Sequence, residues 1–260
     1  MNPLFPLNEY VPDGEPHVFG DRVYLYGSHD EEGGTRFCTR DYTVWSAPVT
    51  DLSDWTCHGV TYKKSQDPRS REGKLVDFYA PDCVQGKDGR YYLYYFAAGP
   101  NTSAFGPMAV AVSDRPEGPF EYRSDIKCQD GTPVLKFLTN DPAVINDDGR
   151  IYLYYGWGFI KDFRNPVLKP LFNFVLSKLC DRSLADIKKT QPSILSCAVV
   201  ELEADMCTVK GEPKAVLDSL TTAKRGTPLY AHPFYEAPSI RKFGEWYYPV
   251  SYTHLRAHET

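Results

Sequence analysis

The sequence predicts an all-β protein, a β-propeller built from four-stranded antiparallel blades. The 260 residues include 19 Tyr, 14 Phe, 19 Gly and 21 Pro, and aromatic strands between Gly and Pro turns are typical of antiparallel sheets. One pattern of strand, glycine turn and aromatic strand also recurs four times. Repeats of roughly 60 residues with about four strands each are typical of propeller blades. A generic β-sandwich is the alternative, and the repeated order of the pattern favours the propeller.

Each repeat holds a short strand, a turn and a second strand rich in tyrosine, and further strands are expected near 43–46, 108–113 and 197–202. The gap between the third and fourth repeats is about 35 residues longer than the others. Apolar residues recur there at helical spacing over 167–189, which predicts a helical insertion near 160–190. These residues are Leu168, Leu171, Phe172, Val175, Leu176 and Leu179.

Charge and composition exclude several classes of protein. The net charge is −5, so no basic surplus predicts a nucleic-acid or membrane-surface partner. No apolar run approaches the ~18–20 residues of a membrane-spanning helix. The N-terminus MNPLFPLNEY lacks the basic and apolar regions of a signal peptide, so a cytoplasmic location is expected. The seven cysteines form no CxxC pair and are expected to be reduced.

The first strand of each propeller blade lines the central channel, so equivalent residues should meet at one axis. The first strands of the four repeats begin at Glu15, Ala80, Asp141 and Glu236, each one or two residues before a proline. Three carboxylates in a partly desolvated pocket have pKa values that split apart. A protonated carboxylic acid beside an ionised carboxylate is what glycoside hydrolysis with inversion requires.

Several segments resemble glycoside hydrolase family 43, in matching order from about residue 1 to 250. They include EPHVFGDRVYLYGS, FYAPDCVQGKDGRYYLYYFAAG, NDPAVINDDGRIYLYYG and EAPSIRKFGEWYY. The resemblance implies a five-bladed propeller and an inverting enzyme that removes arabinofuranosyl or xylosyl units from plant-type oligosaccharides or polysaccharides. It also implies an Asp base in the first blade, a pKa-tuning Asp in the third and a Glu acid in the fourth.

Carried over to this chain, the resemblance implies that Asp141 tunes the pKa and that Glu236 is the general acid. Two residues compete for the base. Glu15 precedes a proline as Asp141 does, and alignment on this proline favours it. Asp13 in PDGEP is the rival, because residues i and i+2 of a strand face the same way.

Further residues are candidates for contacts with a sugar. His29 and His232 lie close to first strands or their loops, and the aromatic residues Trp45, Phe78, Tyr79 and Trp157 could form a sugar platform or pack in the core. The sequence contains no Cys/His metal set and no phosphate-binding glycine loop. No cofactor is therefore expected, apart from a central structural ion such as calcium, which some family members hold.

One propeller domain is expected over residues 1–250. A fifth repeat should begin roughly at residue 300 if the period continues, so the propeller is expected to be incomplete, with about four blades. Residues 251–260, SYTHLRAHET, lack the strand-turn-strand pattern and are expected to be a non-native tail. Two other functions stay open: a non-catalytic carbohydrate-binding propeller, since Glu-Pro replaces Asp-Pro in the first repeat, and a glycoside phosphorylase on the same fold.

Overall fold

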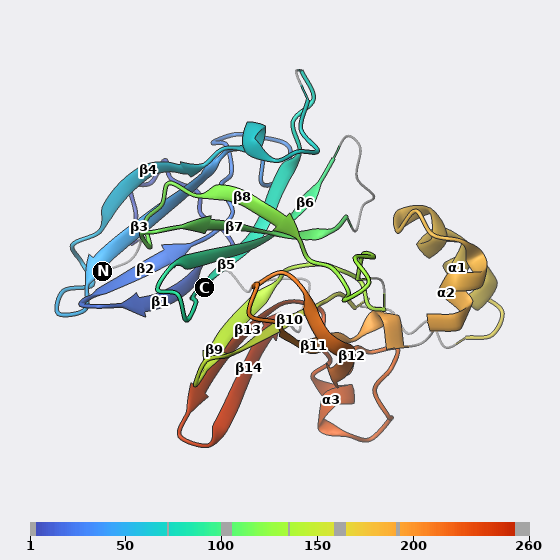
Figure 1. Ribbon diagram of the computed structural model, residues 1–260. Helices are drawn as coiled ribbons and strands as arrows, with labels where there is room; N and C mark the ends of the chain where they lie inside the picture. Colours follow the sequence, from blue (N-terminus) through green and yellow to red (C-terminus); the bar gives the residue numbers. More distant parts are fainter. Residues whose placement is uncertain are drawn as a thin grey trace.

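The structure, a computed structural model, contains three complete blades and the first hairpin of a fourth (Figure 1). In each complete blade, consecutive strands are neighbours, so the chain runs back and forth through four antiparallel strands. The predicted all-β propeller, incomplete in its fourth blade, is confirmed. Within the described residues, no helix is both long and apolar enough to cross a membrane. The structure describes residues 4–71, 73–99, 106–134, 136–158, 165–190 and 193–252.

The strands of the blades follow one another along the chain without crossovers. Blade one holds β1 (Glu15–Phe19), β2 (Arg22–Tyr26), β3 (Tyr42–Pro48) and β4 (Thr56–Tyr62). Blade two, after the 3-10 turn Lys64–Gln66, holds β5 (Asp77–Gln85), β6 (Tyr91–Ala98), β7 (Met108–Ser113) and β8 (Glu121–Asp125). Blade three holds β9 (Ala143–Asp147), β10 (Arg150–Gly156), β11 (Cys197–Leu202) and β12 (Val209–Leu217). The short helix α3 (Pro228–Ala231) precedes the hairpin of β13 (Glu236–Phe243) and β14 (Trp246–Tyr252).

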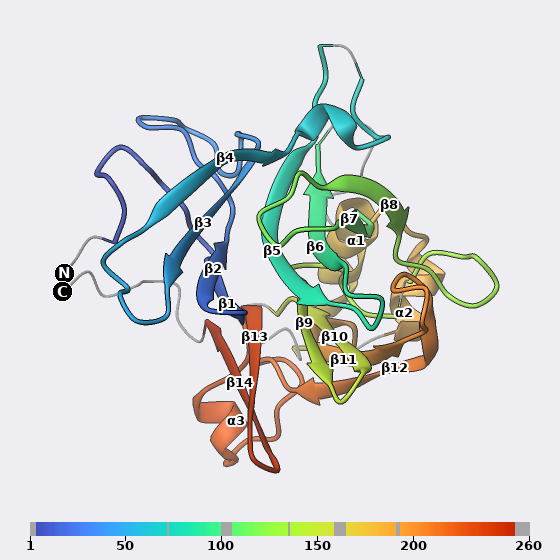
Figure 2. The same ribbon diagram turned by 60° about the vertical axis from the view of Figure 1, so that its left-hand side comes forward.

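The first strands β1, β5, β9 and β13 meet around a common axis (Figure 2). Strand β5 contacts both β1 and β9, and β9 contacts β13. Strand β13 also reaches β1, because the Ser239 hydroxyl donates a hydrogen bond of 2.9 Å to Glu15 Oε2. The first strand of each repeat therefore lines the centre of the molecule, as the propeller prediction requires.

The string Tyr-Leu-Tyr in three of the second strands fixes how the blades correspond. In each of these blades, the second tyrosine of the string pairs with one residue of the first strand. The fourth hairpin lacks the string, but its turn has two residues, as in blades one and three, so counting from the turn identifies the equivalent pair. The pairs are Glu15 with Tyr26, Asp82 with Tyr94, Ala143 with Tyr154 and Ser239 with Val250.

The backbone two residues before each of these positions is left-handed. The φ angles there are 55° at Asp13, 35° at Ala80, 46° at Asp141 and 49° at Ala237, a conformation that costs most L-residues about 1–2 kcal/mol. The equivalent residue to Asp141 in blade one is therefore Asp13. The alignment on proline that matched Glu15 to Asp141 is wrong by two residues.

Aromatic side chains fill the spaces between the blades. Blades one and two share a core in which Tyr26, Phe78 and Leu93 are almost fully buried, and blades two and three share one around Tyr94 and Leu153. Burial of each such side chain contributes about 1.5–3 kcal/mol. The buried tyrosine hydroxyls keep partners: that of Tyr94 donates to the Met206 carbonyl oxygen over 2.8 Å.

The predicted helical insertion is present as two helices rather than one. Helix α1 (Lys169–Leu179) and helix α2 (Leu184–Thr190) are separated by a turn at Asp181, where φ is 49°. They pack with the 3-10 turn Ser193–Leu195 around a small core that is separate from the blades and is capped by Trp157. Of the predicted apolar positions, Phe172 and Leu176 are buried, whereas Leu168, Leu171 and Val175 are exposed.

Within the described residues, the fourth sheet consists of β13 and β14, and it carries several exposed apolar side chains. These are Phe243, Trp246, Tyr247, Tyr248 and Val250. Strand β14 continues through 251–252, so a regular strand enters the segment that is expected to be a non-native tail. Residues 253–260 of that segment lie outside the described residues.

Candidate active site

A cavity of about 390 Å³ opens where the four first strands begin. Its walls come from every blade, because the left-handed residue of each repeat is among those that line it. The lining residues are Asp13, Gly14, Glu15, Pro16, Ala80, Asp141, Pro142, Ala237, Pro238, Ser239, Arg241, Val250 and Ser251.

Asp13 lies in this cavity immediately before β1. Its Oδ2 accepts a hydrogen bond of 2.9 Å from the hydroxyl of Ser28, which follows β2. Burial raises the pKa of Asp13, the Ser28 bond lowers it, and the charge of Asp30 raises it further. Asp13 is therefore a half-buried carboxylate with a neutral hydrogen-bond partner, and in its ionised form it can accept a proton.

Asp141, at the equivalent position of blade three, is the most deeply buried of the acidic residues in the cavity. Burial raises its pKa well above the usual range, and the nearby charges of Asp13 and Glu236 add to this effect. The Ala237 backbone N–H donates to Asp141 Oδ2 over 3.1 Å and opposes the shift. Asp141 therefore links the first strands of blades three and four.

Glu236 is the first residue of β13, and the indole N–H of Trp157 donates to its Oε2 over 2.9 Å. Burial raises the pKa of Glu236, the Trp157 bond lowers it, and the charge of Asp13 raises it. The Gly158 N–H also donates to the Tyr235 carbonyl oxygen over 2.6 Å. A Cβ at position 158 would lie 2.7 Å from the Phe234 carbonyl oxygen, so this close approach requires glycine.

Asp13 and Asp141 line the cavity and Glu236 adjoins it. These three residues, hereafter the pocket carboxylates, are linked through their charges. Asp13 raises the pKa of both others, and Glu236 raises that of Asp141. In the described part of the chain, none of the three forms an ion pair with Lys, Arg or His. Like charges that lack a cation cannot all ionise together, so the group can hold a proton beside an ionised carboxylate at neutral pH.

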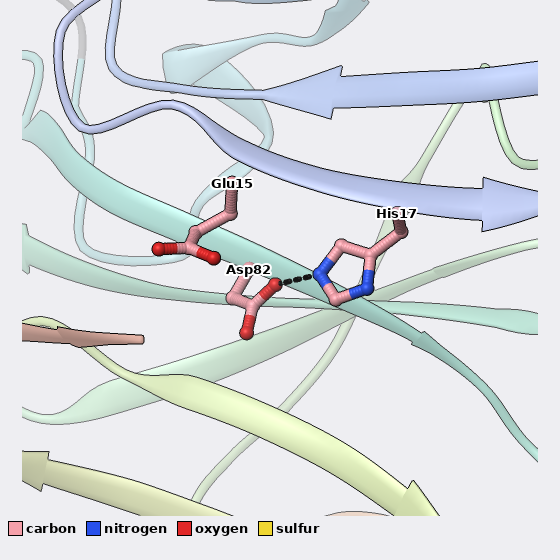
Figure 3. A group of neighbouring side chains, drawn as sticks. All are labelled: Glu15, His17 and Asp82. Carbon is pink, nitrogen blue, oxygen red and sulfur yellow. Dashed lines mark hydrogen bonds and ion pairs between the residues drawn. The ribbon is translucent and has the colours of Figure 1, made fainter. Parts of the chain in front are cut away.

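A second acidic group, Glu15 and Asp82, lies two residues further along the first strands (Figure 3). We call it the axial pair. Glu15 Oε2 accepts hydrogen bonds from Ser239 and, over 2.8 Å, from Arg241. Asp82 accepts from His17 and from the Cys83 and Val144 backbone N–H groups. The axial pair is thus held by protein donors, one of them a guanidinium.

The oxygen and nitrogen atoms of Glu15, His17 and Asp82 lie within 4.8 Å of one another, as metal ligands would. The group nevertheless does not fit the expected calcium, because Arg241 already pairs with Glu15 and a second cation would be repelled. His17 also carries nitrogen, whereas calcium prefers oxygen ligands. The central ion therefore stays a prediction from the resemblance, and no step of the chemistry below depends on it.

Two of the predicted sugar contacts are wrong, because their side chains are packed inside the protein. Phe78 has no exposed surface, and its ring centre lies 4.9 Å from that of Tyr42 and 5.1 Å from that of Tyr62. Trp45 belongs to the third strand of its blade and is 6% exposed, with its ring stacked on Phe5 at 4.5 Å. Neither ring can act as a platform for a sugar.

The other predicted contacts have different surroundings. His29 is buried, and its Nδ1 lies 3.0 Å from the Asp41 carbonyl oxygen, so it has a structural partner. Tyr79 is half-buried beside Phe96, and His232 is exposed at the end of α3. Contacts of Tyr79 and His232 with a sugar stay predictions, whereas Trp157 touches the predicted acid directly.

Sequence reasoning misses Ser28 and Arg241. Ser28 follows the aromatic second strand in YLYGS, and Arg241 lies two residues after Ser239 on the inward face of β13. Strand alternation predicts the inward side of Arg241 once Ser239 is placed. The contact of Ser28 with Asp13 depends on how the segments before β1 and after β2 fold against each other, and no local sequence pattern predicts this.

Comparison with known proteins agrees with a carbohydrate-active propeller. The family model of glycosyl hydrolases family 43 matches residues 2–253. A xylosidase/arabinosidase of Thermoclostridium stercorarium is 38% identical over all of this chain and 48% of its own length. One from Bacteroides ovatus is 30% identical over 97% of this chain and 74% of its own. The chain belongs to glycoside hydrolase family 43.

Solved structures agree with this assignment. A family 43 β-xylosidase/α-arabinofuranosidase from a compost metagenome, in complex with xylotriose, has a TM-score of 0.69 and 26% identity. The alignment covers 97% of this chain and 73% of that one. An enzyme of the same family from Xanthomonas citri, in complex with xylose, also has a TM-score of 0.69. The present chain spans about half the length of the T. stercorarium relative.

Proposed function

We propose that this chain carries the active site of an inverting glycoside hydrolase that removes arabinofuranosyl or xylosyl units from oligosaccharides or polysaccharides. Asp13 is the general base, Glu236 the general acid and Asp141 the residue that tunes their pKa values. The observation that carries this proposal is the shared backbone position of Asp13 and Asp141, together with the charge of Asp13, which raises the pKa values of Asp141 and Glu236.

The choice of Asp13 over Glu15 as the base follows from their partners. Burial and the charge of Asp82 raise the pKa of Glu15, against the lowering effect of Arg241 and Ser239. Glu15 is nevertheless ion-paired with Arg241 and accepts from Ser239 through the same oxygen, so this oxygen is already engaged by protein donors. Among the described residues, Ser28 is the one hydrogen-bond donor to Asp13, and it is neutral; the charge of Asp13 raises the pKa of Glu236. Because the charge of ionised Asp13 raises the pKa of Glu236, it favours the protonated form of Glu236 that a general acid requires.

The reaction then proceeds in one displacement. Ionised Asp13 removes a proton from water, and the water oxygen attacks the anomeric carbon from the face opposite to the leaving group. Glu236 donates its proton to the glycosidic oxygen as the bond to the anomeric carbon breaks. The products are a free sugar of inverted configuration and the shortened chain, and proton exchange with solvent restores both carboxyl groups.

The substrate class is supported by the relatives. Those from T. stercorarium and B. ovatus are described as xylosidase/arabinosidase, and solved relatives bind xylose and xylotriose. The cavity of about 390 Å³ is within the range of small-ligand pockets. A pentose unit at the end of a chain is therefore the proposed ligand.

The two alternative functions find less support. A non-catalytic propeller was suggested by the missing Asp-Pro in the first repeat, but Asp13 occupies the equivalent backbone position. A phosphorylase needs a cationic site for phosphate. Arg241 is the cationic residue among the described lining residues, and Glu15 neutralises it.

The test is the variant Glu236→Gln, assayed on aryl arabinofuranoside and aryl xyloside, with Glu245→Gln as the matched control. Glu245 is an exposed glutamate in the turn of the same hairpin. We expect Glu236→Gln to lose roughly 10²- to 10⁴-fold in kcat/KM and the control to lose nothing. NMR of the first product should show inversion. Equal activity of both variants on both substrates would disprove the proposal.

A further inference from the structure

We infer that Ser28 and Trp157 are positioning residues that each hold one oxygen of a reacting carboxyl group and leave the other oxygen free to react. The inference rests on the proposed function and extends it to two residues that do not themselves exchange protons with the substrate. Ser28 acts on the base and Trp157 on the acid. Each contact is a single hydrogen bond from a neutral donor.

Ser28 directs Asp13 through a hydroxyl that is bonded on both sides. The side chain has no exposed surface, and its Oγ accepts a hydrogen bond of 2.8 Å from the Ala80 backbone N–H. Its own proton then points to Asp13 Oδ2, 2.9 Å away. Because Ala80 belongs to blade two, two blades together fix the orientation of the base. In the described part of the chain, Asp13 Oδ1 has no hydrogen-bond partner and is left for the attacking water.

Trp157 directs the proton of Glu236. An indole N–H can only donate, so Glu236 Oε2, which accepts it over 2.9 Å, cannot also present a proton in that direction. The acidic proton must therefore reside on Oε1, which accepts no hydrogen bond from the described residues. The indole is held in turn by the core of the helical insertion, in which Leu138, Leu176 and Ile194 are buried.

Both donors stabilise the ionised form of their carboxyl group, so their removal should raise its pKa. Other groups also face these carboxyls and would remain in the variants. The charge of Asp30 raises the pKa of Asp13. The charge of Asp13 in turn raises the pKa values of Cys38, Tyr42, Asp141 and Glu236. Around Glu236 the titratable neighbours are Asp13, Asp141 and Tyr235. They act equally in parent and variants, and the shift on substitution therefore reports the missing donor.

The two donors should move opposite limbs of the pH profile of kcat/KM. The base must be ionised, so a higher pKa of Asp13 in Ser28→Ala shifts the acidic limb to higher pH. The acid must be protonated, so a higher pKa of Glu236 in Trp157→Phe shifts the basic limb to higher pH. We expect each shift to be about one pH unit, with a loss of roughly 10- to 100-fold in kcat at the optimum.

The experiment compares four variants by pH profile. Ser28→Ala and Trp157→Phe are paired with Ser113→Ala and Trp45→Phe, which remove a hydroxyl and an indole N–H from residues that do not line the cavity. Ser28→Thr keeps the hydroxyl and should restore the acidic limb. Carboxyl ¹³C NMR titration of Asp13 and Glu236 reads the same pKa shifts without activity, and thermal unfolding checks that every variant is folded.

The outcomes separate this inference from the proposed function. Loss of kcat in Ser28→Ala and Trp157→Phe with both limbs and both ¹³C titrations unchanged would overturn the inference and leave only a packing role. The proposed function fails in a different outcome, in which Asp13→Ala and Glu236→Gln keep full activity. A shift of the acidic limb in Ser28→Ala alone, and of the basic limb in Trp157→Phe alone, supports the assignment of both donors.

Discussion

The pocket carboxylates and the axial pair are two acidic groups on the same first strands, only two residues apart, and they differ in their partners. Glu15 and Asp82 are held by Arg241, His17, Ser239 and two backbone N–H groups. Asp13, Asp141 and Glu236 each receive one neutral donor. Acidic residues at the axis therefore divide into a group that holds the blades together and a group whose charge is left available for chemistry.

The largest expected effect concerns activity. Asp13→Ala should reduce kcat by roughly 10²- to 10⁴-fold, because it removes the base. Glu15→Ala should keep activity within about tenfold but unfold at lower temperature, since Arg241 loses its partner. Hydrolysis of an aryl pentoside is the measurement, and added azide should rescue only the Asp13 variant. Rescue of Glu15→Ala instead would reverse the assignment of the two groups.

A stability experiment sharpens the comparison through the axial pair. In Asp82→Asn, an amide NH₂ must replace one of the oxygens that accept from His17 and from the Cys83 and Val144 N–H groups. Loss of hydrogen bonds to a buried charge predicts destabilisation of about 2–4 kcal/mol. Urea unfolding at pH 7 measures this. A stability equal to that of the parent would mean that the axial pair has no structural role.

An Asp-to-Asn substitution at Asp141, in the pocket, should stabilise the protein, whereas the same substitution at Asp82 should destabilise it. Burial and like charges raise the pKa of Asp141 in the folded state, so its ionisation opposes folding as pH rises above the unfolded value of about 3.9. Asp141→Asn should therefore be more stable than the parent at pH 7, by about 1 kcal/mol or more, with the gain vanishing near pH 3. It should also be nearly inactive. Thermal unfolding between pH 3 and 7 tests the sign directly, and a constant difference across this range would contradict it.

The smallest expected effect concerns the backbone on which both groups are built. Ala80 has φ 35°, whereas Ala143, a buried alanine of β9, is not among the positive-φ residues. Both substitutions to glycine lose one buried methyl group, but only Ala80→Gly relieves a left-handed conformation. We expect Ala80→Gly to be less destabilising than Ala143→Gly by about 1 kcal/mol in urea unfolding. Equal losses would show that the left-handed position carries no strain.

Much of the fold could be predicted from the sequence because its signals are local. The repeated turns and Tyr-Leu-Tyr strings predict the hairpins, and helical spacing predicts the insertion. The break at Asp181 was not predicted, since apolar spacing continues through it. The sequence leaves Phe78 open between a sugar platform and the core, because a buried strand and an exposed one can both be aromatic. Its packing against Tyr42 and Tyr62 in the structure places it in the core.

The sequence predicted that acidic residues form the candidate site, but it did not predict which residue of blade one is equivalent to Asp141. Asp141 and Glu236 were found from their motifs, and they do line or adjoin the cavity. The residue of blade one that is equivalent to Asp141 was misaligned, because proline was used as the anchor. Alignment on Tyr26, Tyr94 and Tyr154 instead selects Asp13, since the hairpin pairing transmits the register of the second strand to the first. Cross-strand pairing is a stronger guide to equivalence than a shared proline.

The left-handed residue recurs in all four repeats, yet only Asp13 and Asp141 place a carboxylate there, while Ala80 and Ala237 do not. The repeated hairpin thus provides four equivalent backbone positions around the axis, all with the same left-handed conformation. Divergence at such a point needs a single codon change and no rearrangement of the chain. The backbone of each repeat is therefore already suited to present a reactive side chain at the axis. Ala80 is a position where protein design could add a third acidic residue to Asp13 and Asp141 at the left-handed positions.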